Sequence, residues 1–258
     1  SDLLEVLPVA VLRVIEAAGY RSGDRFMPPD GTYGDISVAG STWTVEPDVI
    51  SLDDLADVIN STPAEGQTLR FNGTEFVNSF IGLRLPLAIR TASASASLDF
   101  TEFNNAVYRR YEFELENVRP AADDVAMLFR TSTDGGSSYD STGGDYQWSV
   151  TGMNGATAAS SGSVSAGSIV LTGNTAGARP GNAAGEYGVS GVVNLYNAGN
   201  PASATDLQGR INFMNPSAAH SHYTVGGPRD AAADGGACRF LYNGANTASG
   251  IIRMFGIV

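Results

Sequence analysis

The sequence predicts a mainly β protein with an N-terminal helix, a short β-hairpin linker and a C-terminal antiparallel β-sandwich of jelly-roll type. From about residue 98, short segments of apolar and polar alternation follow one another, separated by Gly, Asn, Asp and Pro, with no helical pattern between them. Glycine is abundant, with 31 of 258 residues, and only 16% of residues are charged. Tight turns between short strands require such a composition.

The first element is a predicted helix over residues 2–18. Asp2 can cap it, with Glu5 at capping-box spacing. Apolar residues, Leu7 and Leu12 among them, cover most of its circumference, and a helix that is apolar all round must be buried. The sequence leaves two alternatives for what buries this helix. It lies on the β-domain of its own chain, or it packs on copies of itself or on a docking protein.

Residues 66–79, "GQTLRFNGTEFVNS", are predicted to form a β-hairpin, after a short acidic element at 51–60. Asn-Gly between two alternating runs is the strongest short hairpin signal. The resulting register places Leu69, Phe71 and Phe76 on one face. Because a two-stranded hairpin alone is marginal in water, this face must be covered by another part of the chain or by a second copy.

The C-terminal region reads as about nine or ten strands. In "YEFELENV", residues 111–118, apolar and acidic side chains alternate strictly, so Tyr111, Phe113 and Leu115 should share one face. Further strands are expected at 125–132, 146–152, 167–173, 187–197, 209–215, 220–227, 237–243 and 249–258. The Ser/Ala run at 91–97 is a linker or a first edge strand.

These elements divide the chain into four parts. The expected parts are an anchoring and oligomerisation helix (1–20), an irregular attachment segment with short strands (21–50), a hairpin and linker (51–96) and a C-terminal β-sandwich domain (97–258).

The charge excludes several classes of partner. The net charge is -12, and all 15 basic residues are arginines without a basic cluster, which argues against nucleic acid and anionic membranes. The apolar N-terminal run is too short and too charged to span a bilayer. Cys238 is the single cysteine, so no intramolecular disulfide forms. We therefore expect a chain that is made in a cytoplasm and does not insert into membranes.

Two segments carry a resemblance to a known family. "SLDDLADV…EGQTLRFNGTEFVNS" resembles repeat units in tail fibres and other fibres of tailed bacteriophages. The region from "LDFTEFNNAVYRRYEFELENV" to "CRFLYNGANTASGIIRMFGI" resembles a fibre-tip β-domain. Together the resemblance covers residues 51–82 and 97–258, whereas residues 1–50 match no pattern.

The resemblance implies a homotrimeric fibre on the exterior of a phage or a gene-transfer particle. Its N-terminus would bind virion structural proteins, and its C-terminal domain would bind a polysaccharide of the host cell surface. Copies around an axis would cover each other's apolar faces. The implied subunit interface contains Leu7, Leu12, Leu69, Phe71 and Phe76.

Two other functions remain open beside the fibre. One is a hydrolase that depolymerises capsule or lipopolysaccharide, and the other is a cellular lectin or adhesin. A glycoside hydrolase needs two positioned carboxylates, and none of the acidic residues lies in a recognisable catalytic motif. We therefore expect no enzymatic activity.

Candidate ligand-binding residues come from one strand and three loops. "DYQWS" places Tyr146 and Trp148 on the same strand face, as an aromatic platform for a sugar or, alternatively, as core residues. The polar loops at 174–188 and 226–236 are the natural positions for recognition. The predicted ligand-binding set is Asp140, Asp145, Tyr146, Trp148, Arg179 and Arg229.

The acidic loop also contains "STDGGSSY", residues 132–139, which fits the Asp-box pattern of a hairpin turn. We expect Asp134 to accept backbone N–H bonds within this turn. Asp134, Asp140 and Asp145 could converge on Ca²⁺, although their spacing fits no EF-hand, and the alternative is a solvated loop.

His220 and His222 are the only histidines, and their i, i+2 spacing in a strand puts both on one face. In a trimer they could hold an axial metal ion, as some phage fibres do. The alternative is a chance pair that faces outward. No other cofactor is expected.

Overall fold

The computed structural model describes residues 31–33, 36–39, 42–45, 58–59, 67–71, 74–79, 84–232 and 235–258. These residues contain eighteen strands and no helix, so the predicted mainly β class is confirmed for the part that is described. The predicted helix at 2–18, with Leu7 and Leu12, lies outside the described residues. The chain divides into two compact units, Ser1–Ala64 with Leu69–Ser79, and Glu65–Thr68 with Phe80–Val258.

The first unit contains two small sheets. One is antiparallel and consists of β1 (Gly31–Tyr33), β2 (Ile36–Ala39) and β3 (Thr42–Val45). The other has the order β4-β6-β5 and consists of β4 (Val58–Ile59), β5 (Thr68–Phe71) and β6 (Phe76–Ser79). Short strands within 21–50 and two neighbouring strands on either side of Asn72-Gly73 are therefore present, as predicted.

The hairpin has a third strand that the sequence did not predict. Val58 and Ile59 of β4 pair in parallel with Phe76 and Val77 of β6. The segment 51–60, which was expected to be a short acidic element, thus contains the strand β4. The rings of Phe71 and Phe76 lie 5.3 Å apart, yet these side chains and Leu69 remain 40–55% exposed. The third strand does not cover the apolar face.

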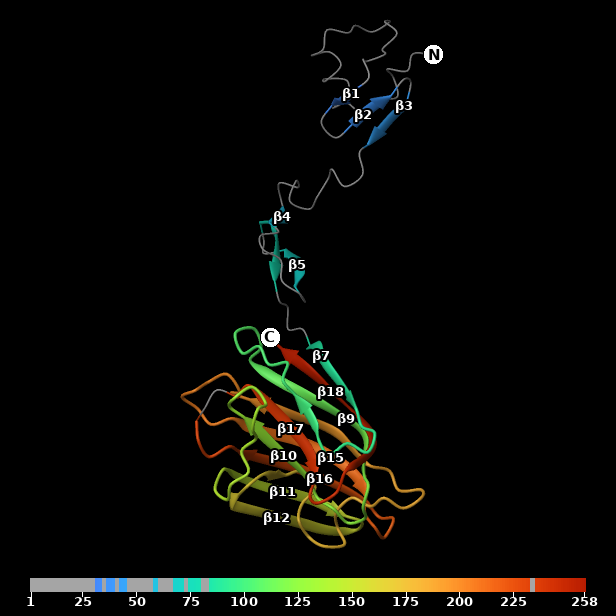
Figure 1. Cartoon of the computed structure of the whole chain (residues 1–258), viewed down its shortest axis with the longest axis vertical. Helices are drawn as coiled ribbons and strands as arrows, with labels where there is room; N and C mark the ends of the chain where they lie inside the picture. Colours follow the sequence, from blue (N-terminus) through green and yellow to red (C-terminus); the bar gives the residue numbers. More distant parts are fainter. Residues whose placement is uncertain are drawn as a thin grey trace, which may run out of the picture. The chain divides into compact units, whose positions relative to one another are not determined.

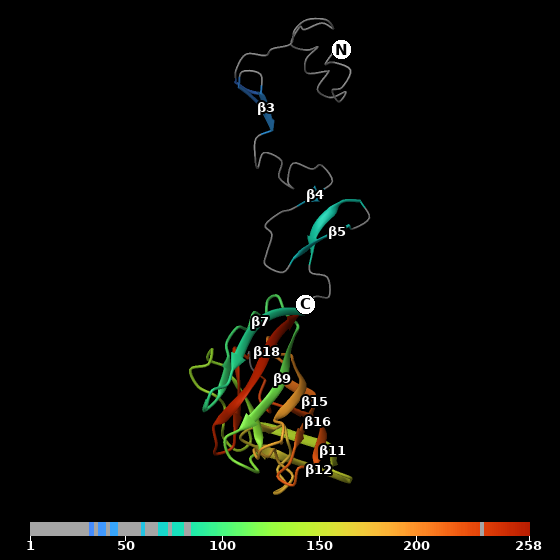
Figure 2. The same cartoon turned by 90° about the vertical axis from the view of Figure 1, so that its right-hand side faces the viewer.

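The second unit consists of two antiparallel sheets that pack face to face (Figures 1 and 2). The larger sheet has the order β12-β11-β16-β15-β14-β9-β18-β7. Figure 2 shows most of these strands following one another in that order. The strands of the larger sheet are β7 (Arg84–Thr91), β9 (Arg110–Pro120), β11 (Tyr146–Asn154), β12 (Thr157–Ala166), β14 (Val189–Tyr196), β15 (Asp206–Met214), β16 (His220–Pro228) and β18 (Thr247–Ile257).

The smaller sheet has the order β13-β10-β17-β8. Its strands are β8 (Leu98–Phe100), β10 (Met127–Ser132), β13 (Ile169–Val170) and β17 (Ala237–Tyr242).

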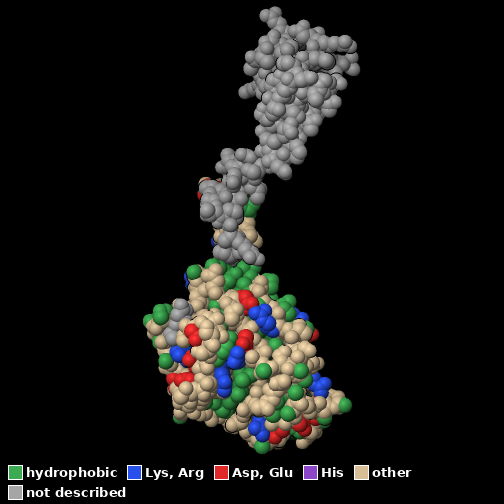
Figure 3. Space-filling view, in the orientation of Figure 1, with side chains coloured by type: hydrophobic (Ala, Val, Ile, Leu, Met, Phe, Trp, Pro, Cys, Tyr) green, Lys and Arg blue, Asp and Glu red, His purple; other side chains and the backbone are tan. Residues whose placement is uncertain are grey.

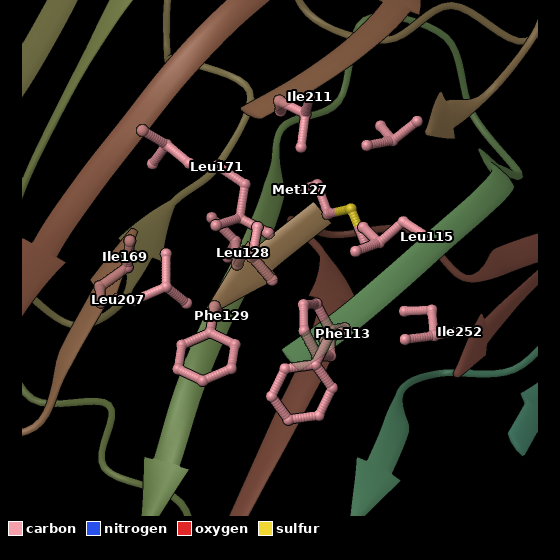
Figure 4. Close-up of a cluster of buried hydrophobic side chains, with 14 of the residues drawn as sticks. Phe113, Leu115, Met127, Leu128, Phe129, Ile169, Leu171, Leu207, Ile211 and Ile252 are labelled. Atoms are coloured by element: carbon pink, nitrogen blue, oxygen red, sulfur yellow. The ribbon is translucent and has the colours of Figure 1, made fainter. Parts of the chain in front are cut away.

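The core lies between these two sheets. Phe240 of the smaller sheet lies 5.2 Å from Phe113 of the larger sheet and 5.1 Å from Phe129, measured between ring centroids. Figure 4 shows side chains of β9, including Leu115, and of β10, including Met127, in the same buried cluster. Aromatic pairs at these separations stabilise the packing beyond the area they bury.

Strand β9 shows why alternation predicts the sheet. Its apolar residues Tyr111, Phe113 and Leu115 are buried, as predicted, and the acidic residues between them point outward. Arg84 of β7 binds Glu112 and Glu114, each at 2.5 Å. Acidic and basic side chains also lie beside one another at several places on the surface of this unit (Figure 3).

Two strands of the larger sheet differ from the sequence prediction. Strand β7 was assigned to the linker, but it pairs with β18 at the edge of the sheet, so the second unit begins before the predicted boundary at 97. Strand β12 was not predicted, and it forms the opposite edge. Its sequence, "TAASSGSVSA", has small side chains and no apolar alternation.

Candidate functional site

A groove with a volume of about 870 Å³ lies on the larger sheet of the second unit. Most of its lining side chains are amides, hydroxyls and glycines from five adjacent strands, and its residues include one arginine and one carboxylate. The lining residues are Gln147, Trp148, Ser149, Thr151, Ser163, Val164, Val192, Asn194, Tyr196, Asp206, Gln208, Gly209, Arg210, Thr224, Val225, Gly226, Gly227 and Pro228. The volume lies in the range of small-ligand sites, whereas the lining is more polar than in most of them.

The groove is built mainly from outward-facing positions of the strands. Across the sheet, Asn194 of β14 pairs with Gln208 of β15, which pairs with Gly226 of β16. In the next row, Arg210 of β15 stands opposite Thr224 of β16. Because side chains alternate along a strand, every second residue of each strand contributes to this face.

Gly226 occupies the middle of the first row. A Cβ atom at this position would have only ordinary van der Waals contact, 3.7 Å from the carbonyl oxygen of Leu207. The missing side chain therefore leaves open space above the sheet.

The polar groups of the groove differ in how they are satisfied. Nε2 of Gln208 donates to the carboxylate of Asp206 at 2.7 Å. Oδ1 of Asn194 is buried and has no hydrogen-bond partner among the described residues. Arg210 is exposed and has no carboxylate partner among the described residues. A ligand with both donors and acceptors would complement these groups.

Tyr196 is the aromatic residue of the groove whose position on its strand faces outward. It is half-buried, and the guanidinium of Arg110 lies 5.7 Å from its ring centroid. This cation–π contact orients the ring at the end of the groove where Asp206 stands opposite it.

Tyr146 and Trp148 lie on one face of β11, as their spacing predicts, but this is the face that packs into the core. Tyr146 is fully buried, and Trp148 is 7% exposed. The Tyr146 hydroxyl accepts the N–H of Thr131 at 2.8 Å. These rings therefore do not form an exposed aromatic platform, and they are core residues, which is the alternative that the sequence left open.

The structure brings four of the predicted residues together around one end of β11. Nε of Arg229 donates to Asp140 at 2.6 Å, and Tyr146 forms a β-bridge with Arg229. The N–H of Asp230 donates to the carbonyl oxygen of Asp145 at 2.8 Å. Asp140 and Arg229 form an ion pair with each other. The cluster therefore connects the loop before β11 to the residues that follow β16.

Arg179 lies apart from that cluster. Its guanidinium donates to both carboxylate oxygens of Asp124, at 3.2 and 3.0 Å, and the N–H of Gly177 donates to the same carboxylate. These hydrogen bonds lower the pKa of Asp124, and the hydrogen bond from Arg179 has the largest effect. Arg179 is thus held by its own chain and does not reach the groove.

The Asp-box segment forms the expected turn. The N–H and the hydroxyl of Ser138 donate to Asp134 at 2.8 and 2.6 Å, and Ser132 Oγ donates to it at 2.7 Å. These bonds lower the pKa of Asp134 to about 2. The carboxylate of Asp145 accepts the N–H of Thr142. Asp134, Asp140 and Asp145 therefore have separate internal partners, and the arrangement gives no support to a shared Ca²⁺ site.

His220 and His222 both point outward from β16 and are exposed, which agrees with the predicted shared face. Asn212 and Met153 flank His222 on the neighbouring strands. Among the described residues, no group of three or more His, Cys, Asp and Glu side chains is arranged to hold a metal ion. An axial metal between copies stays a prediction.

Comparisons of the chain with protein-family models, with curated proteins and with solved structures found no match. In the part of the chain that the structure describes, no helix is long and apolar enough to cross a membrane.

Sequence reasoning missed the groove itself. Asn194, Gln208, Arg210 and Thr224 come from three strands, and none of them stands in a motif. The alternation of each strand was visible, but the order of the strands in the sheet was not.

Proposed function

We propose that this chain is a fibre-type attachment protein of a phage or a gene-transfer particle, and that its C-terminal unit binds a cell-surface glycan. The observation that carries the proposal is the polar groove on the larger sheet, which combines amides, hydroxyls and Tyr196. Sugars present many hydroxyl groups that both donate and accept, and such a lining can satisfy them.

The shape of the groove favours an extended ligand. Five strands that are adjacent in the sheet, β12, β11, β16, β15 and β14, contribute lining residues. Polar contacts are therefore available across several strand spacings of about 4.8 Å each. Gly226 leaves room for a sugar ring near the sheet, and Tyr196 offers an apolar ring surface at one end.

Binding without cleavage is the activity that this lining favours. Hydrolysis of a glycosidic bond needs two carboxyl groups placed about 5–10 Å apart. Asp206 is the single carboxylate among the residues that line the groove, and Gln208 already binds it. The depolymerase alternative therefore has no second carboxylate in this groove.

The exposed apolar face of the first unit supports assembly into a homotrimer. Leu69, Phe71 and Phe76 are 40–55% exposed in the single chain, and burial of such side chains is favourable. Three copies would cover them, and the N-terminal region would attach the fibre to virion proteins. Several weak glycan sites on one assembly would then raise the effective affinity.

The test is binding of the full-length protein to an array of purified bacterial surface polysaccharides. Gly226→Phe fills the groove and should abolish binding. Gly143→Phe is the matched control, because a side chain at this exposed loop position meets nothing within 4 Å. Equal binding by Gly226→Phe and the wild type would refute the groove as the site. Shortened polysaccharide chains after incubation would instead support the hydrolase.

A further inference from the structure

We infer that the groove selects a glycan that carries an anionic group, and that Arg210 binds that group. This inference rests on the proposed function, and it names the class of glycan that the same site takes. It comes from two properties of Arg210 taken together: this residue lines the groove, and it has no carboxylate partner among the described residues.

Six of the eleven arginines of this unit form ion pairs with acidic side chains of their own chain, and Arg109, Arg110 and Arg130 do not, within the described residues. Those with a carboxylate partner are Arg84, Arg90, Arg179, Arg229, Arg239 and Arg253. Arg119 donates instead to two backbone carbonyl groups. Arg210 is exposed and has no carboxylate partner among the described residues, and it is the one arginine that lines the groove.

The immediate neighbours of Arg210 are neutral. Val192 and Thr224 stand directly opposite it on the two adjacent strands, and Thr151 follows on the next strand. The side chain therefore projects among hydroxyl and apolar groups. Within the part of the chain that the structure describes, no carboxylate forms an ion pair with it.

The nearest acidic positions on this face are already occupied. Asp206 is four residues along the same strand, about 13 Å away at the usual rise, and it accepts a hydrogen bond from Gln208. Glu114 lies two strands away, behind Val192, and binds Arg84 at 2.5 Å. Each of these carboxylates thus has a partner of its own, and neither forms an ion pair with Arg210.

A guanidinium fork suits an anionic ligand in particular. It donates two parallel hydrogen bonds to a carboxylate or a phosphate, and such charge-assisted bonds are about twice as strong as neutral ones. The hydroxyl of Thr224, opposite Arg210, can donate a further bond to the same anion. Uronic acids and phosphate-substituted sugars are two common sources of this chemistry in surface polysaccharides.

The overall charge makes this local contact decisive. With a net charge of -12, the chain as a whole repels an anionic polymer. Any preference for such a polymer must therefore arise from a short-range contact, and it should disappear when that contact is removed.

The experiment compares neutral, uronate-containing and phosphate-containing polysaccharides on the array, with the full-length wild type and three variants. We expect the wild type to bind anionic members, and Arg210→Gln to lower the affinity about ten-fold or more. Arg210→Lys should give an intermediate loss, since it keeps the charge without the fork. Arg253→Gln, which changes an arginine of the same sheet outside the groove, should bind like the wild type.

Chemical reduction of uronates to neutral sugars separates the two sources of the anion. Loss of binding after reduction assigns the carboxylate, and binding to phosphate-bearing polymers that survives this treatment assigns the phosphate. Binding of the wild type to neutral members only, or unchanged binding by Arg210→Gln, overturns the inference about the anionic group. In either case the proposed function is retained as long as Gly226→Phe abolishes glycan binding. No binding by the wild type to any member overturns both.

Discussion

Arg229 and Asp140 join two loops that are 89 residues apart in the sequence, with Nε of the arginine 2.6 Å from the carboxylate. Both side chains are mostly buried, with 13% and 26% of their surface exposed. Arg229 also donates to the carbonyl oxygen of Ala231. The contact holds the loop after β16 against the loop before β11.

Arg229→Gln should therefore destabilise the second unit by roughly 1–3 kcal/mol, because it leaves the Asp140 carboxylate without its partner. Urea unfolding followed by tryptophan fluorescence measures the change. The control is Arg253→Gln, whose partner Glu116 is 60% exposed, and it should change stability by less than about 1 kcal/mol. Equal effects of the two variants would contradict the assignment.

The turn at Asp134 should make stability fall in acid. Its pKa in the folded chain is about 2, below the ordinary 3.8, so the ionised carboxylate favours the folded state above pH 4. This contribution is lost as the pH falls from 4 toward 2. Asp134→Asn should show a shallower decline of the urea midpoint over that range, although Asp124, whose pKa is also lowered, keeps part of the slope. Identical slopes would argue against this role of Asp134.

Phe240 should be among the most sensitive core positions. Its ring contacts those of Phe113, Phe129 and Phe100, the last at 6.0 Å. Phe240→Ala should lower the free energy of unfolding by about 3–5 kcal/mol, since it leaves a cavity between the sheets. Val164→Ala, at a side chain that is 80% exposed, should change it by less than about 0.5 kcal/mol.

Phe76→Asp tests the proposed trimer. A charge on the apolar face should dissociate the assembly, while the second unit stays folded because Phe76 belongs to the first. Light scattering gives the mass, and near-ultraviolet circular dichroism reports on the core aromatics. A wild type that is monomeric at micromolar concentration would refute the trimer before any variant is made.

The fold class was readable because alternation is a local property. In β9, Tyr111, Phe113 and Leu115 alternate with acidic residues, and all three are buried as predicted. Strand β12 escaped prediction because its small polar residues give no such contrast, and it is recognisable only through its pairing with β11.

The face of the sheet on which a residue lies is harder to predict from the sequence than the position of the strand. The spacing of Tyr146 and Trp148 correctly placed them together, but alternation does not say which face is covered by the second sheet. Arg210 was overlooked for a related reason. Its significance depends on the absence of a carboxylate from neighbouring strands that are distant in the sequence.

The groove residues alternate with core residues along the same strands: Gln208 and Arg210 face outward, whereas Leu207 and Ile211 are buried. Substitutions on the outward positions can therefore alter ligand preference with little effect on folding. Under the proposed function, this separation means that host range can diverge between lineages while the scaffold stays constant. It also makes these positions suitable for directed evolution of new receptor specificities.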